Sequence, residues 1–213
     1  MFDWTGWLSN SSTFPANTPE IVRQTVPDWD KEGLRMMEFF VRQSMIQILF
    51  SVAPEISLIL FAARVKGRLQ YAFRSSGMPV VFSRKVSVRS LGENTRTDVE
   101  NYIRSQVQRG DFADPRFAER MKRYTVERDD VDLAQPSATN RGRYWYNLHL
   151  VLTVAERYRM GEDVALSRLR DEAFVLAGKQ GYLIKTLSLK PDHLHMALRG
   201  NIEQSPTEIG VAF

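Results

Sequence analysis

The chain has 213 residues, of which 43% are hydrophobic, 11% aromatic and 25% charged. This is the composition of a globular protein, and it excludes disordered, collagen-like and coiled-coil classes. The chain contains no Cys, which excludes disulfides, thiolate nucleophiles and Cys-based metal sites. The formal net charge of +4 is a mild indication of nucleic-acid binding. No apolar run approaches a membrane span and the N-terminus does not resemble a signal peptide, so we expect a cytoplasmic protein with no membrane partner.

In chain order, residues 1–30 are rich in Ser, Thr, Asn and Pro, and we expect them to pack irregularly. Apolar residues three or four apart predict helices, and alternation or β-branched runs predict strands. The expected elements of the first half are a helix over 31–43, a strand over 45–52, a helix over 57–74, one or two short strands over 79–88 and a helix over 97–107.

The second half begins with a charge-dense stretch over 111–142, which we interpret as a linker with some helix around 116–124. After it we expect a strand over 144–157, a helix over 163–178, a strand over 182–189 and another strand after Pro191. These elements predict an α+β fold, an antiparallel sheet with helices packed on it. The predicted organisation is therefore an irregular segment (1–30), a first unit (31–110), the linker (111–142) and a second unit (143–213).

Two of the three histidines lie in the stretch Lys190-Pro191-Asp192-His193-Leu194-His195. Because alternate residues of a strand share a face, His193 and His195 are expected to project in the same direction. Two neighbouring imidazoles form half of a site for a divalent ion, and Asp192 can orient one of the rings. The alternative is a solvent-facing strand with no metal. The third histidine, His149, is expected to be structural.

These residues resemble the single-tyrosine HUH transposases, which include the REP-associated tyrosine transposases of bacteria. The Pro191–His195 stretch is similar to the family's metal-binding strand. Lys66-Gly67, the basic strand from Phe82 to Gly92 and the helix with Tyr102 and Gln106 resemble its nucleophile region. The resemblance implies an HUH or ferredoxin-like sheet, Tyr102 as the nucleophile, and His193, His195 and Gln106 as ligands of Mg²⁺ or Mn²⁺. Independently, the i, i+4 spacing places Tyr102 and Gln106 on one helix face, although a tyrosine there can also be a core aromatic.

In the family the His pair precedes the Tyr helix, whereas here Tyr102 precedes His193. An internal repeat offers an explanation, because Gln47 followed ten residues later by Ser57 aligns with His195 followed ten residues later by Ser205. The chain is then either two transposase-like units in tandem, the second cut short, or one rearranged domain with a single sheet. In both, Tyr102 and the His pair form one composite site, as in a homodimer or a fused pseudo-dimer. A longer natural chain with its own second Tyr helix is the remaining alternative.

The resemblance implies transesterification of single-stranded, hairpin-forming DNA through a 5′-phosphotyrosine link. Single strands bind by phosphate neutralisation and base stacking. The candidates for phosphate contacts are Lys66, Arg68, Arg84, Lys85 and Arg89, and those for stacking are Tyr144, Trp145 or Tyr146. Two other functions remain open: a non-catalytic DNA-binding remnant, and a metal-dependent phosphodiesterase that uses water.

Overall fold

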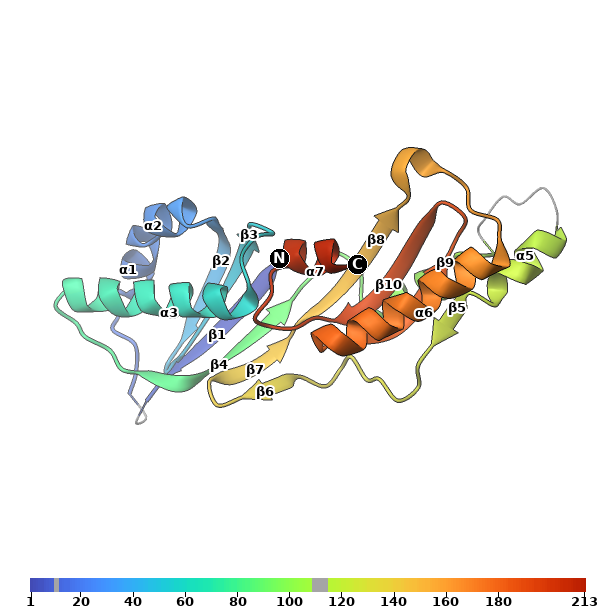
Figure 1. Cartoon of the computed structure of the whole chain (residues 1–213). Helices are drawn as coiled ribbons and strands as arrows, with labels where there is room; N and C mark the ends of the chain where they lie inside the picture. The colour runs from blue at the N-terminus through green and yellow to red at the C-terminus, as the bar shows by residue number, and fades with distance from the viewer. Residues whose placement is uncertain (10–11, 109–114) are drawn as a thin grey trace. The chain divides into compact units, whose positions relative to one another are not determined.

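The strands of the protein form two separate sheets, one of six strands and one of four (Figure 1). The structure, a computed structural model, describes residues 1–9, 12–108 and 115–213. Its helices pack on mostly antiparallel sheets, which confirms the predicted α+β class. The chain divides into two compact units, each assembled from segments that are distant in sequence. Unit 1 contains residues 1–91, 136–146 and 202–207, and unit 2 contains residues 92–135, 147–201 and 208–213.

Unit 1 has the βαββαβ element order of a ferredoxin-like fold. Its four main strands lie in the order β2-β3-β1-β4 with antiparallel neighbours, and β7 and then β6 extend the sheet beyond β4. The elements of this unit are β1 (Phe2–Leu8), α1 (Thr18–Gln24), α2 (Val26–Lys31), β2 (Leu34–Arg42), β3 (Met45–Val52), α3 (Leu58–Ser75), β4 (Phe82–Ser90), β6 (Ser137–Thr139) and β7 (Gly142–Trp145).

The core of unit 1 lies between this sheet and α3, whose buried residues recur three or four positions apart. The ring of Phe61 on α3 lies 5.6 Å from Phe2 of β1 and 5.4 Å from Phe50 of β3. Helix α3 starts where Ser57 accepts a hydrogen bond from the amide of Leu60. Helices α1 and α2 also contact α3, and α2 packs on β2 whereas α3 packs on β1 and β4.

Two predictions for the N-terminal part are wrong. Residues 1–30 are not irregular, because β1 is a central strand whose residues are buried between β3 and β4 and because two helices follow it. Residues 34–42 form strand β2 rather than a helix. The register of β2 shifts between Met36 and Glu38, and this bulge changes the spacing of its inward residues. Because the bulge interrupts the alternation of apolar and polar residues in β2, its apolar residues have a spacing that resembles that of a helix.

Unit 2 has a sheet in the order β5-β9-β10-β8. Its elements are α4 (Arg96–Arg104), α5 (Pro115–Lys122), β5 (Thr125–Glu127), β8 (Asn147–Thr153), a 3-10 helix (Ala155–Arg157), α6 (Asp163–Gln180), β9 (Leu183–Leu189), β10 (His193–Arg199) and α7 (Pro206–Ala212), whose first two residues belong to unit 1. Helix α4 packs on β10 through Ile103 and Ala197, whereas Leu194, on the other face of β10, lies under α6. The two helices therefore cover opposite faces of this sheet. No helix in the described ranges is long and apolar enough to cross a membrane.

The second half of the chain differs from the prediction at two places. The expected strand over 144–157 is divided at Tyr146 into β7, which pairs with β4 in unit 1, and β8, which pairs with β10 in unit 2. The expected linker over 111–142 supplies α5 and β5 to unit 2 and β6 to unit 1. Because the strands form two sheets, the alternative of a single rearranged sheet is wrong.

The topologies of the two units support the internal repeat. The order β8-α6-β9-β10-α7 in unit 2 matches β1-(α1, α2)-β2-β3-α3 in unit 1, and the strand order β9-β10-β8 matches β2-β3-β1. The aligned residues also have equivalent registers, because Gln47 lies opposite Thr5 on β1 and His195 lies opposite Val151 on β8. The helix carrying Tyr102 belongs to unit 2 together with both strand histidines.

Candidate active site

All three histidines of the chain lie together on one face of the sheet of unit 2. The rings of His193 and His195, alternate residues of β10, have centroids 4.9 Å apart. His149 on β8 stacks on His195 at 5.4 Å, and its Nε2 lies 3.2 Å from Nδ1 of His195. We expected His149 to be structural, but it contacts a predicted metal ligand. The sequence could not show this contact, because it depends on the register of β8 against β10.

Helix α4 brings Tyr102 to the same face. The Tyr102 ring lies edge-on to His195 at 5.5 Å and to His149 at 6.0 Å, and 37% of the residue is exposed. These three residues line a pocket of about 500 Å³ whose other walls are Asn94, Asp98, Val99, Asn101 and Val151. A partly exposed phenol beside two imidazoles is a constellation that can perform nucleophilic chemistry. The predicted pairing of Tyr102 with the His strand is thus present within unit 2.

Three sets of contacts stabilise α4, and two of them attach it to the rest of unit 2. A capping box closes its start, in which the Thr95 side chain accepts from the amide of Asp98 and the Asp98 carboxylate accepts from the amide of Thr95. Its apolar side packs through Ile103 against Val131, Leu133 and Ala197. At its end, the Arg104 Nε donates to Glu127 of β5 at 2.6 Å, and this bond helps to hold the pKa of Glu127 below its usual range.

Burial controls the protonation of the imidazoles. His195 is 5% exposed, and burial, together with the positive potential of His193, His149 and Lys190, lowers its pKa to about 4. Burial also lowers the pKa of His149. Both rings are therefore neutral at physiological pH, which allows one nitrogen of the close pair to donate and the other to accept. Neutral imidazole is also the form that binds metal ions.

The three predicted ligands of a divalent cation, His193, His195 and Gln106, all belong to unit 2. The Nδ1 of His193 lies 2.6 Å from the Asp192 carboxylate, which leaves Nε2 as its ligand atom in a carboxylate–histidine arrangement typical of metal sites. In the described ranges, no three His, Asp or Glu side chains converge as a complete metal site, so the His pair needs a further donor. Gln106 is 3% exposed, and its Nε2 donates to the carbonyl oxygen of Tyr102 at 3.3 Å. Gln106 is not among the residues that line the pocket of Tyr102, His149 and His195.

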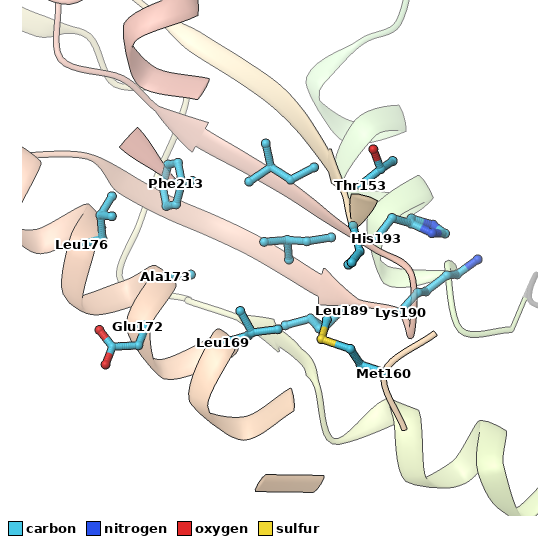
Figure 2. A pocket seen from close by; sticks show the side chains of 13 residues that line it. Thr153, Met160, Leu169, Glu172, Ala173, Leu176, Leu189, Lys190, His193 and Phe213 are labelled. Carbon is cyan, nitrogen blue, oxygen red and sulfur yellow. The ribbon is translucent and has the colours of Figure 1, made fainter. Parts of the chain in front are cut away.

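A second pocket of unit 2, of about 380 Å³, lies beneath α6 (Figure 2). Lys190 and His193 lie at one end of it and Leu176 and Phe213 at the other, while the carboxylate of Glu172 points away. Its walls are mainly Leu, Met and Phe side chains, and His193 is the one predicted site residue among them. Tyr102, His149 and His195 line the first pocket, whereas His193 lines this second one.

The five predicted phosphate contacts all lie in unit 1, in unequal environments. Arg68 forms an ion pair with Glu32, and Arg89 stacks over Trp145 at 4.3 Å. Lys85 is exposed, whereas Lys66 and Arg84 line one pocket. Of the predicted stacking residues, Tyr144 and Tyr146 are 3% and 0% exposed and cannot stack on bases. Both tyrosines belong to unit 1, where the Tyr146 ring lies 6.0 Å from that of Phe2.

No family model and no curated protein matches this chain.

Proposed function

We propose that the protein cleaves and rejoins single-stranded DNA through a transient bond between Tyr102 and a 5′-phosphate, as the resemblance to single-tyrosine HUH transposases implies. The observation that supports this most is the packing of Tyr102 against His195, two residues that are far apart in sequence. His193, His195 and Gln106 would hold Mg²⁺ or Mn²⁺. The buried imidazoles suit Mn²⁺ better than Mg²⁺, which prefers oxygen ligands.

Different groups of the site have different roles in this reaction. When bound, the divalent ion would polarise a non-bridging oxygen of the scissile phosphate and offset developing negative charge. Tyr102 attacks the phosphorus, a neutral imidazole takes the phenol proton and returns it to the departing oxygen, and that oxygen becomes a free 3′-hydroxyl. Attack by another 3′-hydroxyl reverses these steps and releases Tyr102. The number of phosphodiester bonds is conserved, so no nucleotide hydrolysis is needed.

The substrate in this proposal is a hairpin-forming single strand, and the residues that would bind its phosphates are Lys66, Arg68, Arg84, Lys85 and Arg89 of unit 1. The internal repeat supports an intramolecular pseudo-dimer, since one chain contains both copies of the βαββα order. A homodimer is the other assembly that the resemblance implies. We place the protein in the cytoplasm, where such a substrate is accessible.

The proposal is tested by incubating the protein with a single-stranded hairpin oligonucleotide and Mn²⁺ and resolving the products on a denaturing gel. We expect a covalent protein–DNA band for the wild type and for Tyr71→Phe, an exposed helical tyrosine of unit 1, and none for Tyr102→Phe. Absence of the band from the wild type contradicts the proposal. Cleavage without a band indicates a phosphodiesterase that uses water, and binding without cleavage indicates a DNA-binding remnant. A band that persists in the His193→Ala/His195→Ala double variant shows that the metal assignment is wrong.

A further inference from the structure

Unit 1 contains a small pocket at which three basic side chains meet. The pocket has a volume of about 240 Å³, and its rim carries Lys66 of α3, Arg84 of β4 and Arg141, which precedes β7. Its walls are apolar, with Ala62 and Val86 among them, and its lining includes no acidic residue.

The pocket exists because β7 lies unusually close to β4. The two strands pair in parallel with Gly142 opposite Val86, and a Cβ atom on Gly142 would lie 2.3 Å from the carbonyl oxygen of Val86. Only glycine permits this approach, which is reinforced by the hydrogen bond from the amide of Val86 to the carbonyl oxygen of Arg141 at 3.0 Å. Arg141, distant in sequence, is thereby held beside Arg84.

The charges of this pocket are not compensated within the described residues. Arg84 and Arg141 form no ion pair there, and Lys66 donates through Nζ to the neutral carbonyl oxygen of Ser83 at 2.8 Å. Arg68, one turn away on the same helix, is by contrast paired with Glu32. Three like charges around one cavity repel each other, and an anion relieves that repulsion.

We propose that this pocket binds one backbone phosphate of a nucleic-acid strand. A phosphodiester is favoured over a free phosphate because the apolar walls suit the sugar carbons on either side of the phosphate, while guanidinium groups suit its oxygens. The inference rests on the proposed function for the identity of the strand, and it adds Arg141 to the residues that bind DNA.

The test compares two double variants that each remove two positive charges from unit 1. Arg84→Ala/Arg141→Ala removes two of the three positive charges at the pocket, and Arg35→Ala/Arg74→Ala removes two exposed charges outside it. Binding of a fluorescent single-stranded hairpin is measured by anisotropy at several salt concentrations, in EDTA so that no cleavage occurs. We expect the pocket variant to bind about 10-fold more weakly, with a salt slope smaller by about 0.7, as for one lost phosphate contact. The control should remain within about 2-fold of the wild type.

Equal losses in the two variants, or no loss in the pocket variant, overturn the inference. In a second arm, inorganic phosphate is added to the wild type and thermal unfolding is followed. If inorganic phosphate stabilises the wild type and the pocket variant binds DNA as the wild type does, the pocket binds free phosphate. That outcome also overturns the inference. The thermal unfolding of both variants must match that of the wild type, which excludes misfolding. If the wild type forms the adduct at Tyr102 but the pocket variant binds DNA normally, the phosphate assignment of the pocket is wrong. The proposed reaction at Tyr102 is then still supported.

Discussion

Single residues at equivalent positions show how the two units have diverged. In unit 1, Gln47 of β3 donates to Asp3 of β1 at 2.9 Å, and in unit 2, His195 of β10 contacts His149 of β8 at 3.2 Å. The strand registers place Asp3 and His149 at corresponding positions. The same geometry therefore holds an amide–carboxylate pair in one unit and an imidazole pair in the other, and only the second pair is suited to a transition ion.

The buried carboxyl group of Asp3 in unit 1 can be tested through protein stability, without any ligand. Burial raises its pKa, although Gln47 and Arg89 oppose the shift, so the folded protein binds the proton more tightly than the unfolded chain does. The stabilisation linked to this proton is complete below the ordinary pKa of 3.8 and is lost as pH rises through the raised value. We therefore predict that Asp3→Asn raises Tm at pH 7 and has little effect near pH 3. The exposed Asp30→Asn is the control, and an unchanged or lower Tm for Asp3→Asn at pH 7 contradicts the prediction.

His149 is expected to position the ring of His195, since it contacts His195 and lines the pocket of Tyr102. Replacing the partner of a metal-binding histidine typically weakens metal affinity 10-fold or more. We predict that His149→Ala lowers the affinity for Mn²⁺ by about 10-fold, as measured by calorimetric titration. Val151→Ala, which alters the same pocket without removing a ring nitrogen, should retain the wild-type affinity. Equal Mn²⁺ affinities of His149→Ala and the wild type would show that His149 does not support the site.

Among the elements, α4 has the largest consequence for the proposed chemistry, because it carries Tyr102. It has only nine residues, so its own helix propensity is a weak source of stability. The capping box stabilises its start, and the packing of Ile103 and the ion pair between Arg104 and Glu127 hold it against the sheet of unit 2. We infer that the orientation of Tyr102 depends on these contacts at both ends of the helix.

Helices α3 and α4 both start at an N-cap whose side chain accepts a hydrogen bond, and these two caps provide a matched comparison. Thr95→Ala removes the cap of α4, and Ser57→Ala removes the cap of α3 in unit 1, each at a cost of about 1 kcal/mol in the free energy of unfolding. We predict that only Thr95→Ala slows formation of the covalent DNA adduct, by several-fold, while both variants lose similar stability to urea. Equal adduct rates in the two variants would show that the start of α4 does not control Tyr102.

At the scale of the whole molecule, the sequence predicts the class of fold and many elements but not the way the units share the chain. The helix from Ser57, strand 45–52 and the buried face of Phe82, Val86 and Val88 are confirmed, since their periodicity is local. The interleaving is not predictable, because it depends on β7 and β8 pairing in different sheets after a break of one residue. Bulges, such as the one in β2, further hide alternation.

The candidate site was also predictable only in part, because local patterns are visible in the sequence and contacts between distant segments are not. A strand motif and a helix spacing identify His193, His195 and Tyr102 as separate groups, and the structure brings Tyr102 and His195 into contact. His149 and Arg141 carry no signal of their own, because their roles arise from strand registers between distant segments. The internal repeat is the one feature of the sequence that indicates a composite site, and the equivalent topologies of the two units support it.

In the proposed reaction, Tyr102 becomes covalently linked to DNA. The most direct measurement is mass spectrometry of the wild-type protein after reaction with a single-stranded hairpin and Mn²⁺, followed by digestion with nuclease and trypsin. The peptide over residues 97–104 contains one tyrosine and is bounded by Arg96 and Arg104, so a linked nucleotide there is assigned without ambiguity. The account predicts a nucleotide on Tyr102 of this peptide. Cleaved DNA with this peptide unmodified, or a nucleotide on any other side chain, would contradict it.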